Sequence, residues 1–367
     1  MRERKWTDDK LNLIREYLKL GVQYSEIAKK MKTSWDTIEH VIRRYNLKEG
    51  IVIVNKQEKT FTQTNKELIY ELKNQLKKVS PTKRNLNKSI TKIGDTLMIH
   101  FTDWHVGRIV KDELGSEIYN TEIFKKRIGR LLREILKLLD EYIRKGTPIK
   151  DVVIMSTGDI LDGMGIFATQ ETQSEMSPPF QVMLAVEVIQ GFILSLLERK
   201  LNVTFYGVRG NHGEIRGDRG KAKDPNANWD MQLYLILSFW ANTMLKNDKV
   251  KIYYSELDYL NFKIQNWRYH IRHIAPKQAE TASGKAKFLG WAKKHDIDVL
   301  VYGHYHHYGI NDRSGVTVIR GGSVTGADEF SEQLAEESEP IQLLWGCSKH
   351  RPVTFMYAID LGKRKRK

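Results

Sequence analysis

Residues 301–309 read VYGHYHHYG and place three histidines, His304, His306 and His307, directly after the apolar run of residues 299–302. A run of four apolar residues at this point has the length and composition of a buried strand. On an extended backbone, side chains two positions apart lie on the same side, so His304 and His306 would project together. Such a pair suits two ligands aimed into one pocket. It also suits an ordinary polar strand end. The residues at the other strand ends are needed to distinguish a ligand pair from an ordinary strand end.

Strand-like and helix-like segments alternate through the larger part of the chain. Apolar runs of strand length lie at residues 97–101, 152–155, 203–208, 299–302 and 316–319. Helix-like stretches lie between them, at residues 122–144, 181–199, 229–245 and 281–294. This alternation predicts an α/β domain with an at least partly parallel sheet. In such sheets the reactive side chains gather just past the carboxyl ends of the strands.

Five of the predicted strand ends are followed by aspartate, asparagine or histidine. In chain order these residues are Asp103 and His105, Asp159 and Asp162, Asn211 and His212, His270 or His273, and His304 and His306. Two divalent cations roughly 3.5–4 Å apart can clamp a phosphoryl group and hold a hydroxide for in-line attack. A carboxylate has to bridge the cations, and oxygen and imidazole ligands suit Mn²⁺, Fe²⁺ or Zn²⁺. The lack of cysteine ligands argues against a structural zinc site.

The fourth strand end leaves two histidines as candidates. Tyr269, Ile271 and His273 share one face of the alternating segment WRYHIRH, and His273 lies furthest along it. This position favours His273 over His270 as the ligand. The alternative for the other histidine is a hydrogen-bonded strand residue.

The motifs D-x-H, G-D-x-x-D, G-N-H, a strand-end histidine and G-H-x-H together resemble the calcineurin-like metallophosphoesterase superfamily over roughly residues 95–325. The resemblance implies a four-layer αββα sandwich, in which two mixed sheets lie between helices. It also implies two divalent metal ions, with Mn²⁺ favoured and Fe²⁺, Zn²⁺ and Mg²⁺ as alternatives. By the same resemblance, one ion takes Asp103, His105, Asp159 and His306, and the other takes Asp159, Asn211, His273 and His304. His212 would lie beside the scissile phosphate and stabilise or protonate the leaving oxygen. Asp162 would orient His212 or support the metal ligands from outside the coordination sphere. The chain departs from the family pattern in having Gly213, where an acidic residue often follows G-N-H.

Residues 1–48 show the spacing of three short helices. Helices are expected from Thr7 to residue 20, over residues 25–31, and from a cap at Thr33 or Ser34 to Tyr45. The tight step between the second and third helices resembles helix-turn-helix DNA-binding domains, in which the later helix enters the major groove. The candidate reading face comprises Asp36, Thr37, His40, Arg43 and Arg44. The alternative is a small helical protein-interaction module.

The net charge of +15 is unevenly placed along the chain. Residues 1–48 hold 12 Lys/Arg against 7 Asp/Glu, residues 49–92 hold 10 against 4, and the last five residues are KRKRK. Residues 93–362 are nearly neutral, with 33 against 34. Basic flanks on a neutral body predict binding to a polyanion such as nucleic acid. Arg209 and Arg216 flank the G-N-H loop and are further candidates for phosphate contacts, although a solvated charge run is the commoner explanation.

The composition sets the domain plan and the compartment. We expect a helix-turn-helix domain over residues 1–48, a basic linker over 49–92, and a catalytic domain with a basic tail over 93–367. A helical segment at residues 65–78 in the linker carries a narrow apolar stripe that docks on the core or pairs with a second chain, so a homodimer is one expectation.

The single cysteine, Cys347, excludes an intramolecular disulfide and fits a cytoplasmic protein. The N-terminus shows no signal peptide, and residues 181–197 are expected to form a buried helix and not a membrane span.

The resemblance alone does not name the substrate, because the superfamily hydrolyses phosphoproteins, nucleotides and nucleic acids. The N-terminal domain and the basic linker favour a DNA nuclease tethered to DNA, with DNA favoured over RNA. Within the superfamily the chain most resembles DNA-repair nucleases of the Mre11/SbcD type and related phage-encoded phosphoesterases. An ATPase partner is not expected, because only about 40 residues follow the last motif. The alternatives are a phosphodiesterase or phosphatase acting on small nucleotides, and a DNA-binding regulator with an inactive phosphoesterase body, against which the complete ligand set argues.

Overall fold

The chain divides into two compact units, Met1–Glu71 and Leu72–Lys367. The computed structural model describes residues 6–19, 24–47, 94–147, 149–217, 220–221, 224, 226–274, 282–326 and 339–362. The predicted linker over residues 49–92, its helical segment and the basic residues 363–367 lie outside the described residues.

The first unit contains three helices, α1 (Asp8–Lys19), α2 (Tyr24–Lys30) and α3 (Trp35–Arg44). Their inner faces form one apolar cluster, made of Ile14, Leu18, Ile27, Ala28, Ile38, Val41, Ile42 and Leu47. The side chain of Ser34 caps α3 by accepting a hydrogen bond from the backbone N–H of Thr37 at 3.3 Å. The three predicted helices are therefore confirmed, and of the two candidate caps Ser34 is the one used.

The second unit is built on a six-stranded sheet with the order β15-β14-β1-β4-β5-β8. Its strands are β1 (Thr96–Phe101), β4 (Asp151–Ser156), β5 (Asn202–Gly207), β8 (Val250–Tyr254), β14 (Ile341–Cys347) and β15 (Phe355–Asp360). The four strands β1, β4, β5 and β8 are parallel, and β14 and β15 add antiparallel pairs. Phe101 pairs with Ser156, and Ser156 pairs with Gly207, so three strands end at the same edge.

A five-stranded sheet faces the first one, with the order β12-β13-β11-β10-β9. Its strands are β9 (Tyr259–Ile264), β10 (Trp267–Arg272), β11 (Val299–Tyr302), β12 (Gly309–Arg313) and β13 (Val316–Arg320). The three central strands are parallel and the two edge strands are antiparallel. Two short ribbons complete the strands, β2 (Val110–Lys111) with β3 (Glu117–Tyr119) and β6 (Arg216–Gly217) with β7 (Gly220–Lys221).

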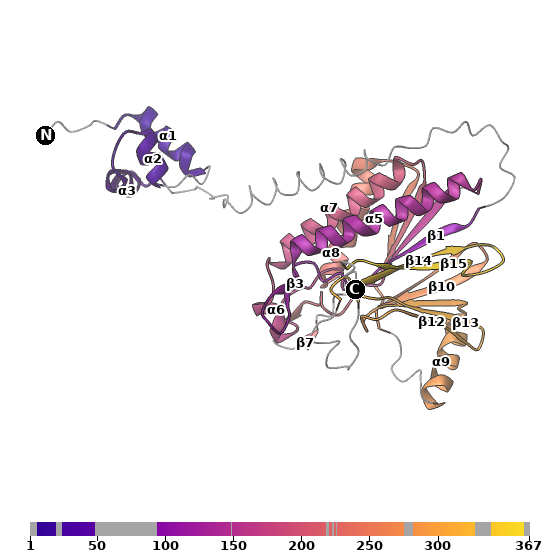
Figure 1. The fold of residues 1–367 in the computed structure, drawn as a ribbon. Coiled ribbons are helices and arrows are strands. Elements are labelled where there is room, and N and C mark those ends of the chain that lie inside the picture. Colours follow the sequence, from indigo (N-terminus) through magenta and orange to yellow (C-terminus); the bar gives the residue numbers. More distant parts are fainter. Residues whose placement is uncertain are drawn as a thin grey trace. The chain divides into compact units, whose positions relative to one another are not determined.

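Helices cover the outer faces of the two sheets. They are α5 (Thr121–Arg144), α7 (Pro178–Leu197), α8 (Trp229–Phe239), which continues as the π-helix η1 (Trp240–Leu245), and α9 (Ala282–His295). A further short helix is α6 (Ala168–Thr172). Figure 1 shows α5 and α7 on one side of the paired sheets and α9 on the other. The ring of Phe192 on α7 contacts that of Phe101 on β1, with 5.0 Å between ring centroids. On the far side, Phe288 of α9 packs against the second sheet. The predicted four-layer αββα sandwich is confirmed.

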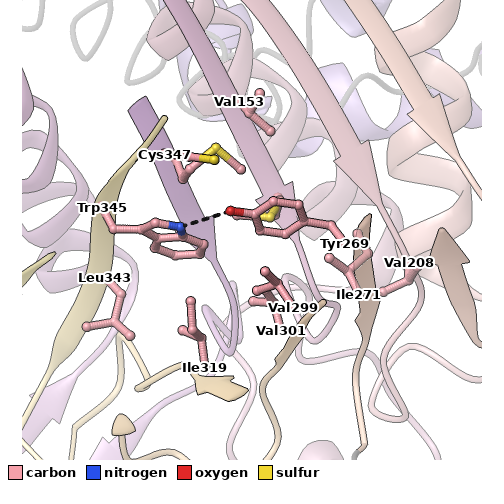
Figure 2. Close-up of a cluster of buried hydrophobic side chains, with 12 residues drawn as sticks. Val153, Val208, Tyr269, Ile271, Val299, Val301, Ile319, Leu343, Trp345 and Cys347 are labelled. Carbon is pink, nitrogen blue, oxygen red and sulfur yellow. Dashed lines mark hydrogen bonds between the residues drawn. The ribbon is translucent and has the colours of Figure 1, made fainter. Parts of the chain in front are cut away.

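Side chains from both sheets interlock between them and hold them together. The cluster contains Met98, Val153, Met155, Val208, Tyr269, Ile271, Val299, Val301, Ile319, Leu343, Trp345 and Cys347. In Figure 2 the indole of Trp345 and the phenol of Tyr269 point toward each other, and the indole N–H donates to the phenol oxygen at 3.5 Å. Because this core ties the two sheets together, loops at the ends of strands from both sheets can build one site.

Among the described residues, α7 is the one helix long and apolar enough to cross a membrane by length and composition. In this fold, 61% of the most apolar part of α7 is buried inside the protein. Its buried Gln181 accepts a hydrogen bond from the backbone N–H of Gly163 at 2.8 Å and donates one to the carbonyl of Met176 at 3.0 Å. The helix therefore packs in the core, as the sequence predicts.

Candidate metal centre

Sharp turns after the strands deliver the candidate ligands. Five of the seven predicted ligands have positive φ angles, namely Asp103 (52°), His105 (46°), Asp159 (51°), His304 (76°) and His306 (61°). Residues other than glycine rarely adopt this left-handed conformation, which costs energy and persists only where the surrounding structure enforces it. Such backbones are concentrated at functional sites. The turns aim the five side chains toward one another.

A first group contains Asp103, His105 and His306, all buried, with one ligand atom of each within 4.8 Å of the others. The Nε2 atoms of His105 and His306 lie 3.1 Å apart, and Nε2 of His306 lies 3.6 Å from Oδ1 of Asp103. Two imidazole nitrogens and a carboxylate oxygen that converge at a buried position form a donor set that suits a divalent cation.

A second group contains Asp159, His273 and His304, again with donor atoms within 4.8 Å of one another. Nδ1 of His273 donates to the carbonyl oxygen of Thr157 at 2.8 Å, which turns Nε2 toward Oδ2 of Asp159 at 2.9 Å. Asn211 lines a pocket together with His273, and its Oδ1 is buried without a hydrogen-bond partner among the described residues. A buried acceptor of this kind is costly unless a ligand satisfies it.

Asp159 connects the two groups. It also forms a group with His105 and His212, so its carboxylate lies between the two predicted metal positions. The residues present therefore fit two divalent cations that share Asp159. The structure brings together all seven predicted ligands, and their assignment as ligands stays a prediction. The identity of the metal stays a prediction as well.

The extended conformation predicted for His304 and His306 is wrong. The strand β11 ends at Tyr302, and the backbone then turns, with N–H of Tyr305 donating to the carbonyl of Gly303 at 3.0 Å. His304 and His306 therefore lie in a turn and not on an extended strand, although they belong to different groups as the predicted ligand sets require. A side chain on Gly303 would overlap Thr102 and Asp103, which explains the glycine at the start of the turn. His307 belongs to neither group.

The ambiguity between His270 and His273 is resolved by the strand geometry. His273 lies in the second group, whereas His270 lies on the other face of β10, where its Nδ1 is 2.6 Å from Oδ1 of Asn261. The ring of His270 stacks on that of Tyr259 at 4.9 Å, and burial, with help from the nearby Arg272, lowers its pKa to about 3. His270 is therefore the neutral, hydrogen-bonded strand histidine of the alternative reading.

The charges in the centre are strongly coupled. Burial alone would raise the pKa of Asp159, but His273 and His212 outweigh it and hold that pKa well below its usual range. Burial alone would lower the pKa of His273, but Asp159 raises it to about 9. Without a cation the two side chains therefore form an ion pair, and a metal ion that binds Nε2 of His273 has to displace a proton.

His212 is held beside both groups by a second carboxylate. Its Nδ1 lies 3.2 Å from Oδ1 of Asp162, and its backbone N–H donates to Oδ1 of Asp159 at 2.8 Å. Burial would lower the pKa of His212, but Asp159 and Asp162 raise it above its usual value. The shift favours the protonated imidazole, which is the form that can act as a general acid. This arrangement agrees with the predicted roles of His212 and Asp162 without testing them.

Sequence reasoning missed Asp230, a buried carboxylate in the first turn of α8. Its Oδ2 accepts hydrogen bonds from the N–H groups of Asp159 and Gly210, each at 2.9 Å, and its Oδ1 accepts one from Leu161 at 3.3 Å. It thus ties the G-D-x-x-D turn to the G-N-H turn. A side chain on Gly210 would overlap Asp159, so the two turns pack in direct contact. The one local signal was Asn228, a helix cap two residues before Asp230.

Sequence reasoning also missed a chain of hydrogen bonds behind Asp103. Nε2 of His100 lies 2.8 Å from Oγ1 of Thr157, which donates to Oγ1 of Thr102 at 2.7 Å. Thr102 in turn donates to Oδ2 of Asp103 at 2.6 Å. His100, Thr102 and Thr157 are fully buried polar side chains. The chain fixes the rotamer of Asp103 and leaves Oδ1 turned toward His306.

We expect Thr102→Val to weaken Mn²⁺ binding, because valine keeps the shape but removes the donor to Asp103. Partners of metal ligands typically contribute about 10–100-fold to metal affinity. The affinity can be measured by isothermal titration calorimetry with Mn²⁺, and Thr204→Val on β5 serves as the control. Unchanged Mn²⁺ affinity in Thr102→Val would show that the hydrogen-bond chain does not position the ligand.

The predicted nucleic-acid contacts fall into two sets. His40, Arg43 and Arg44 are exposed on α3, where Arg43 also pairs with Glu39 at 2.7 Å. Near the metal centre, Arg209 donates twice to Oδ1 of Asp258, at 3.0 and 2.8 Å. Arg216 lies in the exposed ribbon and donates twice to Glu214, at 2.9 and 2.6 Å. Arg209 lines the pocket beside the metal centre, whereas Arg216 is not among the residues that line it.

A four-layer fold with a carboxylate–imidazole centre at its strand ends defines the class of metal-dependent phosphoester hydrolases. A model of the calcineurin-like phosphoesterase family matches residues 97–308, which is more than half of the chain. The chain therefore belongs to the calcineurin-like phosphoesterase family. A model of a helix-turn-helix domain matches residues 9–55, which suggests nucleic-acid binding. Family membership implies a phosphoesterase hydrolase that uses divalent metal ions.

Several solved structures are similar to the chain at low identity. They include vacuolar protein sorting 29 from Cryptosporidium parvum (15% identity, 75% of this chain and 95% of that chain, TM-score 0.34). An archaeal phosphodiesterase matches at 12% identity (72% and 99%, TM-score 0.33), and a hypothetical protein from Pyrococcus horikoshii OT3 at 14% (74% and 90%, TM-score 0.35). No match is found among the curated proteins. At these TM-scores the structural likenesses add nothing to the family assignment.

Proposed function

We propose that the protein is a two-metal-dependent DNA nuclease, which its helix-turn-helix domain holds on DNA in the cytoplasm. The observation that carries the proposal is the pairing, in one chain, of a phosphoesterase centre with a helix-turn-helix unit. Its third helix exposes His40, Arg43 and Arg44. A unit of this type gives a phosphoesterase that acts on nucleic acid a second contact with its substrate.

The chain's own residues divide the chemistry as follows. When bound, two divalent cations neutralise the phosphoryl oxygens and supply an activated water for in-line attack. Asp159 holds the two positions together, and the other six candidate ligands fix the geometry of the donors. His212, whose pKa Asp159 and Asp162 raise, is held by Asp162 and donates a proton to the leaving oxygen of the broken P–O bond. The leaving strand then departs as an alcohol, and the other product keeps the phosphate.

The direct test is cleavage of end-labelled linear, circular and single-stranded DNA with Mn²⁺, beside an EDTA control and the double variant Asp159→Asn, His212→Ala. Cleavage that disappears in both controls would support the proposal, and the products would show whether free ends are needed. RNA substrates run in parallel decide between DNA and RNA. Hydrolysis of bis-p-nitrophenyl phosphate without any cleavage of DNA would favour the alternative, a phosphodiesterase of small nucleotides. A metal-free protein after supply of Mn²⁺ would favour a regulator with an inactive body.

The role of the N-terminal unit has a separate test. We expect Arg43→Gln with Arg44→Gln to lower cleavage of plasmid-length DNA about tenfold at moderate salt, because each removes a candidate phosphate contact. Hydrolysis of bis-p-nitrophenyl phosphate should not change. Lys137→Gln with Lys145→Gln on α5 and its cap removes the same charge and serves as the control. Equal losses in the two double variants would mean that only net charge matters.

A further inference from the structure

A pocket of about 140 Å³ opens directly beside the second group of candidate ligands. Its lining includes Asn211 and His273, both predicted to bind the second metal, together with the charged side chains of Arg209, Arg272 and Asp258. Arg272 is the neighbour of His273 in the chain, so one strand end supplies both a candidate ligand and a cationic wall. The pocket is thus continuous with the metal centre and is not a separate site.

The guanidinium of Arg272 is held by an aromatic ring, but its Nε–H donor has no hydrogen-bond partner among the described residues. It lies over the ring of Trp291 on α9, with 5.3 Å from the central guanidinium carbon to the ring centroid. Its Nε is buried and has no hydrogen-bond partner among the described residues. Burial lowers the pKa of Arg272, although Asp258 opposes the shift, and a guanidinium stays charged at any physiological pH. A partly buried cation with an unpaired hydrogen-bond donor costs free energy unless an anion binds and neutralises it.

The charges around the pocket leave a place for one such anion. Asp258 is already engaged by Arg209, which donates two hydrogen bonds to one of its oxygens. Glu214, the other acidic side chain of the lining, is engaged by Arg216. Three arginines therefore share two carboxylates. The excess positive charge falls on Arg272, which has none of these carboxylates as a hydrogen-bond partner.

We propose that this pocket, with Arg272 as its anchor, binds the phosphate next to the scissile one in the substrate. The inference rests on the proposed phosphodiester hydrolase, and it makes Arg272 a specificity-determining residue for substrates that carry a second phosphate. A guanidinium binds phosphate with two parallel hydrogen bonds, and the contact with the ring of Trp291 holds the Arg272 side chain in position for it. Simple diesters without a neighbouring phosphate leave the pocket unused.

The kinetic test uses two pairs of chromogenic substrates that differ by one phosphate. One pair is the p-nitrophenyl ester of thymidine 5′-phosphate with and without a 3′-phosphate. The other is the p-nitrophenyl ester of thymidine 3′-phosphate with and without a 5′-phosphate. We expect kcat/KM to be about tenfold higher for the phosphorylated member of one pair, the effect of one charged hydrogen-bond contact. Arg272→Gln should abolish this preference and leave hydrolysis of bis-p-nitrophenyl phosphate within about twofold.

Two further variants separate the contact from effects on the fold. Arg272→Lys keeps the charge without the paired donors and should keep part of the preference. Arg268→Gln, at the other end of the same strand, removes ion pairs with Asp296 and Asp298 and should leave the preference intact. A preference that survives Arg272→Gln, or that is missing from the wild-type protein in both pairs, overturns the proposal.

A binding measurement keeps the test independent of turnover. Calorimetry on the Mn²⁺-loaded full chain compares thymidine 3′,5′-bisphosphate with its two monophosphates. The bisphosphate should bind the wild type about tenfold more tightly than Arg272→Gln, whereas at least one of the monophosphates should not distinguish them. Equal binding of the bisphosphate by the wild type and Arg272→Gln would contradict the proposed phosphate subsite, even if the protein cleaves DNA. A clear difference would retain it even if no diester is hydrolysed, so the two proposals fail separately.

Discussion

Asp159→Asn should reduce hydrolysis of bis-p-nitrophenyl phosphate on the order of a thousandfold, the value of about 4 kcal/mol of lost metal-ion catalysis. Asp159 is the residue that belongs to both the group with His273 and His304 and the group with His105 and His212. An amide keeps the size of the side chain, but it removes the negative charge that would lie between the two cations. The measurement is kcat/KM with saturating Mn²⁺, together with the number of Mn²⁺ ions bound per chain.

Asp151→Asn is the matched control. Asp151 is an exposed residue at the start of β4, the strand that precedes Asp159, and it accepts a hydrogen bond from Asn202. It should leave both activity and metal content unchanged. Removal of metal from the wild type with EDTA should reproduce the loss of activity, and added Mn²⁺ should restore it. Full Mn²⁺ content and activity in Asp159→Asn would rule out the bridging role.

The second large effect is expected on stability. Asp230→Ala should lower the free energy of unfolding by roughly 3–9 kcal/mol, because it leaves three buried N–H groups unsatisfied at about 1–3 kcal/mol each. Asp230 is fully buried, and the N–H groups belong to Asp159, Leu161 and Gly210. Thermal unfolding of the metal-free protein followed by circular dichroism should show a melting temperature lower by about 10 °C.

A control and a second readout distinguish this effect from ordinary loss of packing. Asp224→Ala changes an exposed turn residue that accepts one hydrogen bond from Asn226, so its effect on stability should be small. Asp230→Asn keeps the shape and one acceptor, so it should lose less stability than Asp230→Ala. It should still weaken Mn²⁺ binding, because the two ligand-bearing turns lose a shared anchor. A melting temperature of Asp230→Ala within about 2 °C of the wild type would mean that water or relaxation satisfies those N–H groups.

The parts of the fold that the sequence predicts well are those with strong local patterns. The strands β1, β4 and β11 are mostly apolar and buried, and α5 carries a regular apolar stripe. The strands β14 and β15 were not predicted, because they run antiparallel to their neighbours and interrupt the alternation of strand and helix. The strands β8 and β9 escaped because they are half-exposed edges with alternating polar residues.

The candidate site divides in the same way. Ligand types follow strand ends, so local motifs identify Asp103, His105, Asp159 and the histidines after β11. The supporting residues have no local pattern. Asp230 acts on backbone groups 71, 69 and 20 positions away, and Thr157 bonds His100 across 57 positions. Such partners depend on which turns the two sheets bring together, and that information is absent from any short stretch of the chain.

The left-handed backbone at the candidate ligands has a consequence for protein engineering. At each of those positions a glycine would relax the conformation, and for a residue other than glycine the left-handed region costs roughly 1–2 kcal/mol. A directed-evolution screen that selects only for thermal tolerance would therefore not preserve His304 or His306. The survivors would be robust proteins with the active centre erased. Any stabilised version of this enzyme should be selected for turnover at every round.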